Sequence, residues 1–155
     1  MNRWIALILF LVAAFAAAAI GGIATASSVG EWYLTLDKPT WNPPSWVFGP
    51  AWTLLYILMS IAAWRVWLVR ENAIARTLLK LHGAQLGLNA LWSILFFGLR
   101  SPSLALVNIL ALLGVLIAMQ INLLRCDRTA GYLWMPYLVW VTFATALNAT
   151  IWWLN

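Results

Sequence analysis

The chain has 155 residues, of which 65% are hydrophobic and only 8% are charged. This composition leaves too little polar surface for a water-soluble domain, so it predicts an integral membrane protein. The net charge is +5, but the basic residues stand in short stretches between apolar segments, a pattern typical of membrane topology that argues against nucleic acid as a partner. One cysteine, Cys126, and one histidine, His82, exclude a disulfide framework and a metal site of clustered Cys or His ligands.

Five apolar segments are each long enough to cross a bilayer as a helix of roughly 20 residues. They cover approximately residues 4–24, 46–69, 78–99, 104–124 and 130–154. Because open strands are unstable in lipid and the alternating pattern of a barrel is missing, the sequence predicts an all-α fold. We therefore expect residues 1–155 to form a single domain, a bundle of five transmembrane helices.

The first segment allows two interpretations. Arg3, the apolar run and the small residues Ala24-Thr25-Ala26 resemble a secretory signal peptide with its cleavage site. Ala14, Ala18 and Gly22 instead recur every four positions, as in a helix that packs closely against a neighbour. We favour the second interpretation, a retained transmembrane helix.

A loop rich in Trp and Pro, residues 25–45, joins the first two segments. Pro43 and Pro44 lack amide donors and exclude a helix there, and Ser45 is a candidate cap for the helix that follows. Composition alone favours an aromatic belt at the membrane surface, although a stiff aromatic loop also suits a lid over a pocket. The tryptophans that run from the loop into the next helix are Trp32, Trp41, Trp46 and Trp52.

The basic residues are unevenly divided between the two ends of the predicted helices. The end with the N-terminus carries Arg3, Arg65, Arg70, Arg76, Lys80, Arg125 and Arg128, whereas the other end carries Lys38 and Arg100. For a bacterial cell membrane, the positive-inside rule places the N-terminus in the cytoplasm and the loop 25–45 on the opposite side.

The third segment has two distinct helical faces. Gly83, Gly87 and Ala90 share one face, where the Gly-xxx-Gly spacing allows close approach of a helix from a second copy or from the same chain. Spacing alone favours neither partner, and we adopt a homodimer as the hypothesis. Gln85 and Asn89 lie on the opposite face, where amides at membrane depth need partners inside the protein.

Two other segments carry similar stripes of large aromatic and small residues. These are Phe48, Trp52 and Tyr56 on the second segment, and Trp140, Ala144, Leu147 and Asn148 on the fifth. Such stripes form either a tightly packed core or an apolar cavity with a few polar groups. Spacing alone favours the core.

Several stretches together form a specific pattern that covers almost the whole chain. They are Lys38-Pro39-Thr40-Trp41-Asn42-Pro43-Pro44-Ser45-Trp46-Val47-Phe48-Gly49-Pro50, Gln85–Ser93, Phe96-Phe97-Gly98, Pro136–Trp140 and Leu147-Asn148. In them the chain closely resembles a bacterial member of the translocator protein family, the tryptophan-rich sensory proteins and peripheral benzodiazepine receptors. The resemblance implies a five-helix bundle, often a homodimer, with a pocket under the first loop, and it leaves an outer membrane open as the location.

The resemblance also implies ligands and the residues that bind them. The ligands are porphyrins such as protoporphyrin IX and other haem-pathway tetrapyrroles, with no obligatory cofactor, and sterols in animal members. The implied pocket residues are Trp41, Phe48, Trp52, Asn89, Trp92, Trp140, Ala144, Leu147 and Asn148, with Gly22, Thr25, Leu104 and Val107 matched less securely. Animal members carry a tyrosine and a basic residue after the fifth helix, and residues 151–155 contain neither, which argues against tight binding of sterol-like ligands.

Three functions are compatible with the predicted fold and pocket. The first is a sensor or transporter that binds a tetrapyrrole, and the second is an enzyme that degrades porphyrin with light or oxygen through electron transfer from Trp41 or Trp140. The third is a scaffold that modulates partner membrane proteins. The sequence offers no acid–base pair, activated nucleophile or metal site at membrane depth, so any chemistry would belong to the porphyrin itself. Binding is therefore favoured over catalysis.

Overall fold

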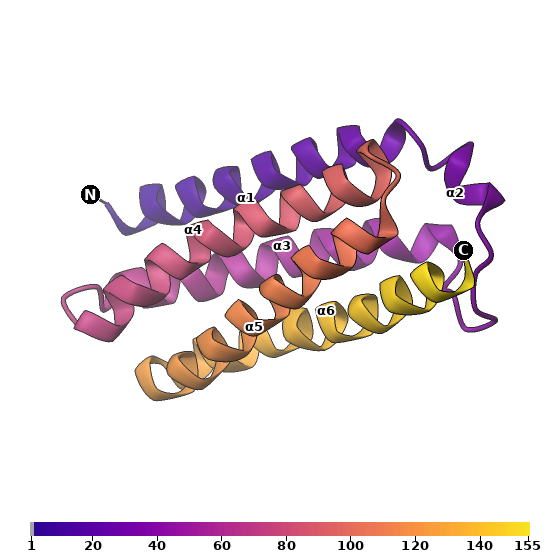
Figure 1. The fold of residues 1–155 in the computed structure, drawn as a ribbon. Coiled ribbons are helices and arrows are strands. Elements are labelled where there is room, and N and C mark those ends of the chain that lie inside the picture. Colours follow the sequence, from indigo (N-terminus) through magenta and orange to yellow (C-terminus); the bar gives the residue numbers. More distant parts are fainter. Residues whose placement is uncertain (1) are drawn as a thin grey trace.

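The computed structural model describes residues 2–155 and shows an all-α protein. Its six α-helices are α1 (Arg3–Ala26), α2 (Trp32–Thr35), α3 (Ser45–Leu68), α4 (Ala73–Ser93), α5 (Pro102–Cys126) and α6 (Arg128–Leu154), and a π-helical turn, η1 (Ile94–Gly98), continues α4. The long helices lie side by side, with α2 and the C-terminus at one end of the bundle and the N-terminus at the other (Figure 1). The predicted count of five helices therefore missed α2, which lies inside the predicted loop 25–45.

Polar side chains cap the helices that begin at the N-terminal end of the bundle. Asn2 accepts a hydrogen bond from the backbone amide two residues later at 2.9 Å, and Asn72 does the same at 2.8 Å. Asp127 accepts one from the amide three residues later at 2.9 Å. Each bond satisfies one of the amides that a helix start leaves without an intrahelical partner, which fixes where α1, α4 and α6 begin.

Two details of the helices differ from the sequence prediction. Ser45 is the first residue of α3, and its predicted role as the cap falls to Pro44, which makes no side-chain hydrogen bond. α4 begins at Ala73 instead of residue 78, because the Asn72 cap starts the helix in a stretch whose charged residues lower its hydropathy.

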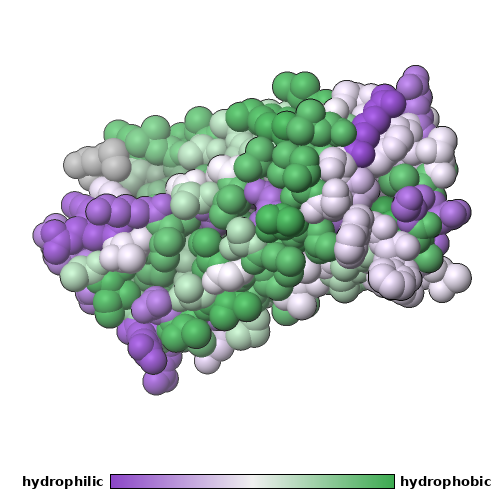
Figure 2. All heavy atoms as spheres, in the orientation of Figure 1, coloured by the Kyte–Doolittle hydropathy of each residue, from purple (hydrophilic) through white to green (hydrophobic). Residues whose placement is uncertain are grey.

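The surface of the bundle is apolar along its middle. Four helices, α1, α3, α5 and α6, are long and apolar enough to cross a membrane. The face seen in Figure 2 carries a broad hydrophobic surface, with hydrophilic side chains gathered toward the ends. The exposed apolar side chains include Ile8, Val12, Ile20, Val107, Ile117 and Val139. This surface suits a multi-pass membrane protein whose helices contact lipid.

The core lies where α3, α4, α5 and α6 meet. Its largest fully buried side chains include Met59, Leu112, Leu116, Met119 and Trp134. At the N-terminal end of the bundle, Arg65 of α3 forms an ion pair of 2.9 Å with Asp127, in the turn between α5 and α6. At the other end, the Ser28 hydroxyl donates to the Phe97 carbonyl at 2.7 Å and ties the end of α1 to η1.

Candidate ligand-binding cavity

A cavity of about 700 Å³ lies in the half of the bundle next to α2. Its walls come from α1, α3, α4, η1 and α6, together with Tyr33 of α2 and Val29, which lies between α1 and α2. None of the residues that line it is charged. A cavity of this volume falls within the range of roughly 300–1,000 Å³ that is usual for small-molecule sites, and its lining suits an apolar ligand.

The structure gathers most of the predicted pocket residues around this one cavity. Phe48, Trp52, Asn89, Trp92, Trp140, Ala144, Leu147 and Asn148 line it, as do the less securely matched Gly22 and Thr25. Leu104 and Val107 do not line it, since α5 contributes no lining residue, and their side chains are 51% and 68% exposed on the outer surface. That the gathered residues bind a ligand stays a prediction.

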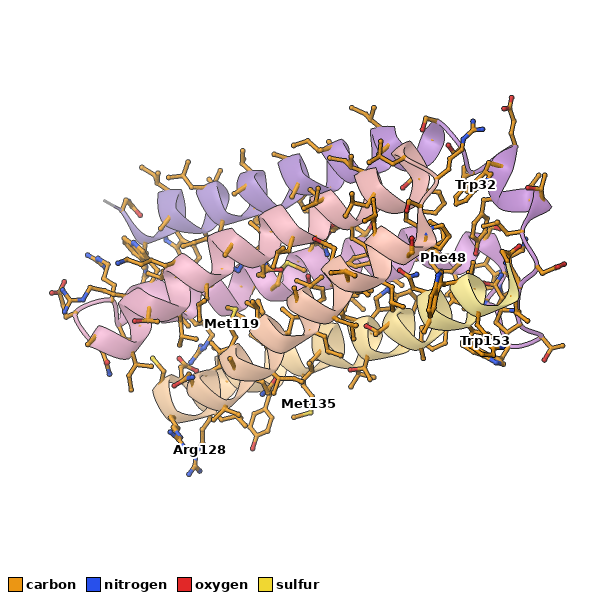
Figure 3. All side chains as sticks on the ribbon, viewed as in Figure 1. Trp32, Phe48, Met119, Arg128, Met135 and Trp153 are labelled. Carbon is orange, nitrogen blue, oxygen red and sulfur yellow. The ribbon has the colours of Figure 1, made fainter. Side chains whose placement is uncertain are left out.

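Trp41 lies in the loop and outside the cavity wall. Its ring is 5.8 Å from that of Phe143, which in turn lies 5.6 Å from the ring of Trp140. The loop is tied to the end of α6 by Asn155, whose side-chain amide accepts from the Asp37 backbone N–H and donates to the Asp37 carbonyl, both at 2.9 Å. The ring of Phe143 therefore separates Trp41 from Trp140 in the cavity wall. Trp32 and Phe48, labelled in Figure 3, mark this end of the bundle.

Aromatic rings on two sides of the cavity are fixed by contacts with each other. On one side Trp140 packs edge to face against Phe48, with centroids 6.0 Å apart, and against Trp52, with centroids 6.4 Å apart. On another side Trp92 and Phe96 stack, with centroids 5.2 Å apart. Rings held in this way present flat apolar faces before any ligand arrives, which favours a flat apolar partner.

The two amides of the cavity are already hydrogen-bonded within the protein. Asn148 Oδ1 accepts from Trp92 Nε1 at 2.9 Å, and Asn148 Nδ2 donates to the Pro102 carbonyl at 2.8 Å. Asn89 Oδ1 accepts from the Tyr56 hydroxyl at 2.6 Å. These bonds join α4 to α3 and α6, so the amides shape the cavity and have little capacity left for a ligand.

The sequence analysis identified only part of the contribution of α1, namely Gly22 and Thr25. Phe15, Ala18 and Ala19, Gly22, and Thr25 and Ala26 of α1 all line the cavity. Their spacing of three and four residues was the available signal, because it places them on one face of a helix. Gly21 brings α1 close to α4, since a Cβ there would lie 3.0 Å from Ser93 Oγ.

The cavity is open along one side. Its lining residues Ala19 and Gly22 of α1 and Gly49 and Thr53 of α3 are exposed, whereas those on α6 are buried or half-buried. The hydrogen bonds that join α1 to α3 all lie in the other half of the bundle, where the Trp64 indole donates to a carbonyl at the start of α1 at 2.8 Å. The open side of the cavity therefore faces outward between α1 and α3.

The predicted dimer face on α4 is only partly on the surface. Gly83 and Gly87 are exposed, and a Cβ added to either would meet no atom within 4 Å. Ala90 is 8% exposed and packs in the core of the protein, so it cannot belong to an outward face. Of the predicted dimer face, only the two glycines therefore lie on the outer surface.

Comparison with known proteins identifies the family of the chain. A family model described as the TspO/MBR family matches residues 8–154. The chain is 42% identical over 152 residues to the tryptophan-rich protein TspO of Archaeoglobus fulgidus, an alignment that covers 96% of each protein. It is 40% identical over 150 residues to protein CrtK of Rhodobacter capsulatus, covering 96% of this chain and 94% of that one.

A more distant relative comes from animals. The human translocator protein is 38% identical over 126 residues, covering 79% of this chain and 73% of the human one. Together with the match over residues 8–154, these identities show that the chain belongs to the TspO/MBR family.

Proposed function

We propose that the chain is a membrane receptor that binds a porphyrin in the cavity between α1, α3, α4 and α6. Protoporphyrin IX is the representative ligand. The observation that carries the proposal is a cavity of about 700 Å³ walled by fixed aromatic rings and lined by no charged residue. A flat macrocycle can stack on these rings at about 1 kcal/mol per aromatic contact beyond the burial of area. Sensing or transport of the bound pigment would follow from this binding step.

The uncharged lining predicts where the carboxylates of a bound porphyrin lie. A buried carboxylate needs a cation or several hydrogen-bond donors, and the lining residues provide no cation. The propionates of a porphyrin should therefore remain at the mouth of the cavity while the ring enters it. Removing their charge should then cost little affinity.

Titration of the protein in lipid nanodiscs tests this proposal. Protoporphyrin IX and its dimethyl ester should both bind saturably with one site per chain, followed by the change in porphyrin absorbance. Their affinities should be similar when each concentration is expressed as a mole fraction in lipid. Absence of saturable binding by both compounds would refute the proposed function. Loss of binding by the ester alone would show that the carboxylates are the main point of recognition and would refute the assigned pose.

We also propose that α4 crosses the membrane, so that residues 1–155 form one domain with five transmembrane helices. α4 has 21 residues, and it is continued by η1. Its buried polar residues Gln85, Asn89 and His82 all have partners or neighbours inside the bundle, which lets the helix cross lipid despite its lower hydropathy. The excess of basic residues at the N-terminal end supports a cytoplasmic location for that end.

A second candidate function is light-dependent degradation of the bound porphyrin. The observation that favours it is the row of rings Trp41, Phe143 and Trp140, which runs from the loop to the cavity wall with centroid separations of 5.8 and 5.6 Å. Such a row can pass an electron between the solvent side and an excited macrocycle. Illumination of the bound complex should then give one product, and Trp140→Phe should abolish it; equal bleaching in the variant would indicate ordinary photochemistry.

A further inference from the structure

A chain of hydrogen bonds leads from the cavity into the other half of the bundle. Tyr56 donates to Asn89 Oδ1 at 2.6 Å, and Asn89 Nδ2 donates to the Tyr137 hydroxyl at 2.9 Å. Tyr137 in turn donates to Gln85 Oε1 at 2.8 Å. Gln85 Nε2 lies 3.3 Å from His82 Nδ1, and because an amide nitrogen can only donate, His82 Nδ1 accepts and the imidazole proton is on Nε2.

Three buried polar atoms at the far end of this chain have no hydrogen-bond partner within residues 2–155. They are His82 Nε2, Trp134 Nε1 and Gln120 Oε1, and their side chains are 4%, 1% and 8% exposed. The rings of His82 and Trp134 pack edge to face with centroids 6.0 Å apart. Gln120 Nε2 donates at 3.1 Å to the carbonyl of Gly131, one turn before Trp134 on α6.

These contacts bring the three side chains to about the same depth of the bundle, from three different helices. His82 comes from α4, Gln120 from α5 and Trp134 from α6. Met119, labelled in Figure 3, precedes Gln120 on α5 and lies in the half of the bundle away from Trp32 and the loop. The site is therefore separate from the cavity described above.

The unpartnered atoms have complementary roles. Trp134 Nε1 can only donate, and His82 Nε2 donates because it carries the proton. Gln120 Oε1 accepts, since its Nε2 is directed at the Gly131 carbonyl. A water molecule accepts two hydrogen bonds and donates at least one, so it matches all three atoms. A cation would face two N–H donors, and an anion would face the amide oxygen.

We infer that His82, Trp134 and Gln120 form a binding site for one water molecule, and that the chain through Gln85 and Tyr137 couples this site to the floor of the cavity. Polar atoms left unpaired inside a bundle surrounded by lipid are costly, and one water relieves all three. The coupling rests on the proposed function, because it requires the ligand to bind in the cavity. There the ligand contacts Tyr56 and Asn89, and hydrogen bonds in a chain polarise one another, so the contact is felt at His82.

His82 is the only histidine, which makes the water site directly testable. In protein labelled with ¹⁵N at histidine alone and embedded in bilayers, solid-state NMR should show a neutral Nε2–H imidazole that receives magnetisation from water. Gln120→Leu should strongly reduce this transfer. Asn122→Leu is the matched control on the same helix, since Asn122 donates to a carbonyl of α5 itself, and it should leave the transfer unchanged.

Two results would overturn the site. One is the absence of water transfer to His82 in the unaltered protein, or an equal transfer in Gln120→Leu. The other is an Nδ1–H imidazole, which would remove the donor role of His82 Nε2.

Adding protoporphyrin IX dimethyl ester tests the coupling. The His82 resonance should shift in the unaltered protein and stay in place in Tyr137→Phe, which removes only the hydroxyl between Asn89 and Gln85; Gln85→Met is a second break in the chain. Binding is followed separately by absorbance in each protein. Binding without a shift of His82, or a shift that persists in both variants, refutes the coupling and leaves the proposed function intact. Absence of binding by both the ester and protoporphyrin IX refutes the proposed function, whereas the water transfer to His82 stands or falls independently.

Discussion

Ala144 shows how much the cavity depends on single small side chains. It lines the wall that α6 contributes, one turn from Trp140 and close to Leu147, both of which are far larger. Because the side chain is half-buried and faces open volume, a larger one can extend into the cavity without displacing the core. The space beside Ala144 therefore serves the ligand more than it serves the stability of the fold.

We predict that Ala144→Phe weakens porphyrin binding at least about 10-fold, which corresponds to about 1.4 kcal/mol, while the protein stays folded. The physical reason is steric, since the ring occupies the volume that the macrocycle needs. Titration in nanodiscs measures the affinity. Ala146→Phe is the matched control, because Ala146 is exposed on the same helix and does not line the cavity. An unchanged affinity in a folded Ala144→Phe protein would place the ligand elsewhere.

Asp127 combines two stabilising roles at the opposite end of the bundle. It caps α6, and it pairs with Arg65 through bonds of 2.9 and 3.2 Å. Burial is the largest single influence on the pKa of this carboxyl and raises it, but the hydrogen bond from the Ala130 amide and the bond and charge of Arg65 outweigh it, so the pKa lies below its ordinary value of 3.8. The charged form is therefore the one that the folded protein favours.

We predict that Asp127→Asn lowers the free energy of unfolding by about 1 kcal/mol at neutral pH, mainly through the lost charge pair and a weaker cap. Since the folded-state pKa is depressed, this contribution is present above the ordinary pKa and disappears as pH falls through the folded-state value. Unfolding in detergent between pH 7 and pH 3 measures the difference, which should shrink toward the acid end. The control is Glu71→Gln, an exposed acid at the same end. An equal loss in both variants would contradict the role of the cap and the pair.

Among the elements, those with a long apolar pattern were predictable and the short or polar ones were not. α1, α5 and α6 were found to within a few residues, because each is a nearly continuous apolar run. α2 was missed since it has only four residues and no side-chain cap, and the start of α4 was placed too late because charged residues precede its apolar part. The π-turn η1, which brings Phe96 and Phe97 into the lining, carries no signal in the hydropathy.

The exposed glycines of α4 lead to a testable prediction about dimerisation. We expect a homodimer in which Gly83 and Gly87 allow close approach of two α4 helices, so Gly87→Leu should weaken the dimer by steric clash. Analytical ultracentrifugation or cross-linking in bilayers measures the association. Gly114→Leu on α5 is the matched control, because Gly114 is also exposed with no atom near its missing Cβ. If both variants dimerise like the unaltered chain, the glycine surface has another use.

At the scale of the whole molecule, the sequence predicted which helices carry the site but not how they close around it. The stripes on α3, α4 and α6 were identified, and they do face one cavity. On α1 only Gly22 and Thr25 were named, since the small residues of this helix suit close packing as well as a cavity wall. The hydrogen-bond partners of Asn89 and Asn148 also could not be predicted from the sequence, because a bond such as that from Trp92 to Asn148 joins residues far apart in the chain.

The topology of the bundle leads to a testable prediction about which side of the membrane each loop faces. With Cys126 replaced by Ser, single cysteines at Thr40 and Ser103 should react with a membrane-impermeant reagent added outside the cell, whereas a cysteine at Glu71 should react only after permeabilisation. All three positions are exposed. Labelling of Glu71 and Ser103 from the same side would show that α4 does not cross the membrane. Labelling of Thr40 from the cytoplasm alone would reverse the orientation.

The opening between α1 and α3 changes what an affinity for this protein means. Under the proposed function, a ligand dissolved in the bilayer enters the cavity from the side, so its occupancy follows its mole fraction in lipid and not its concentration in water. A compound that partitions tenfold more strongly into the membrane measures as tenfold tighter, about 1.4 kcal/mol, without a single new contact. Solubility in lipid thus governs delivery, and the choice among equally lipid-soluble molecules falls to the aromatic wall formed by Phe48, Trp52 and Trp140.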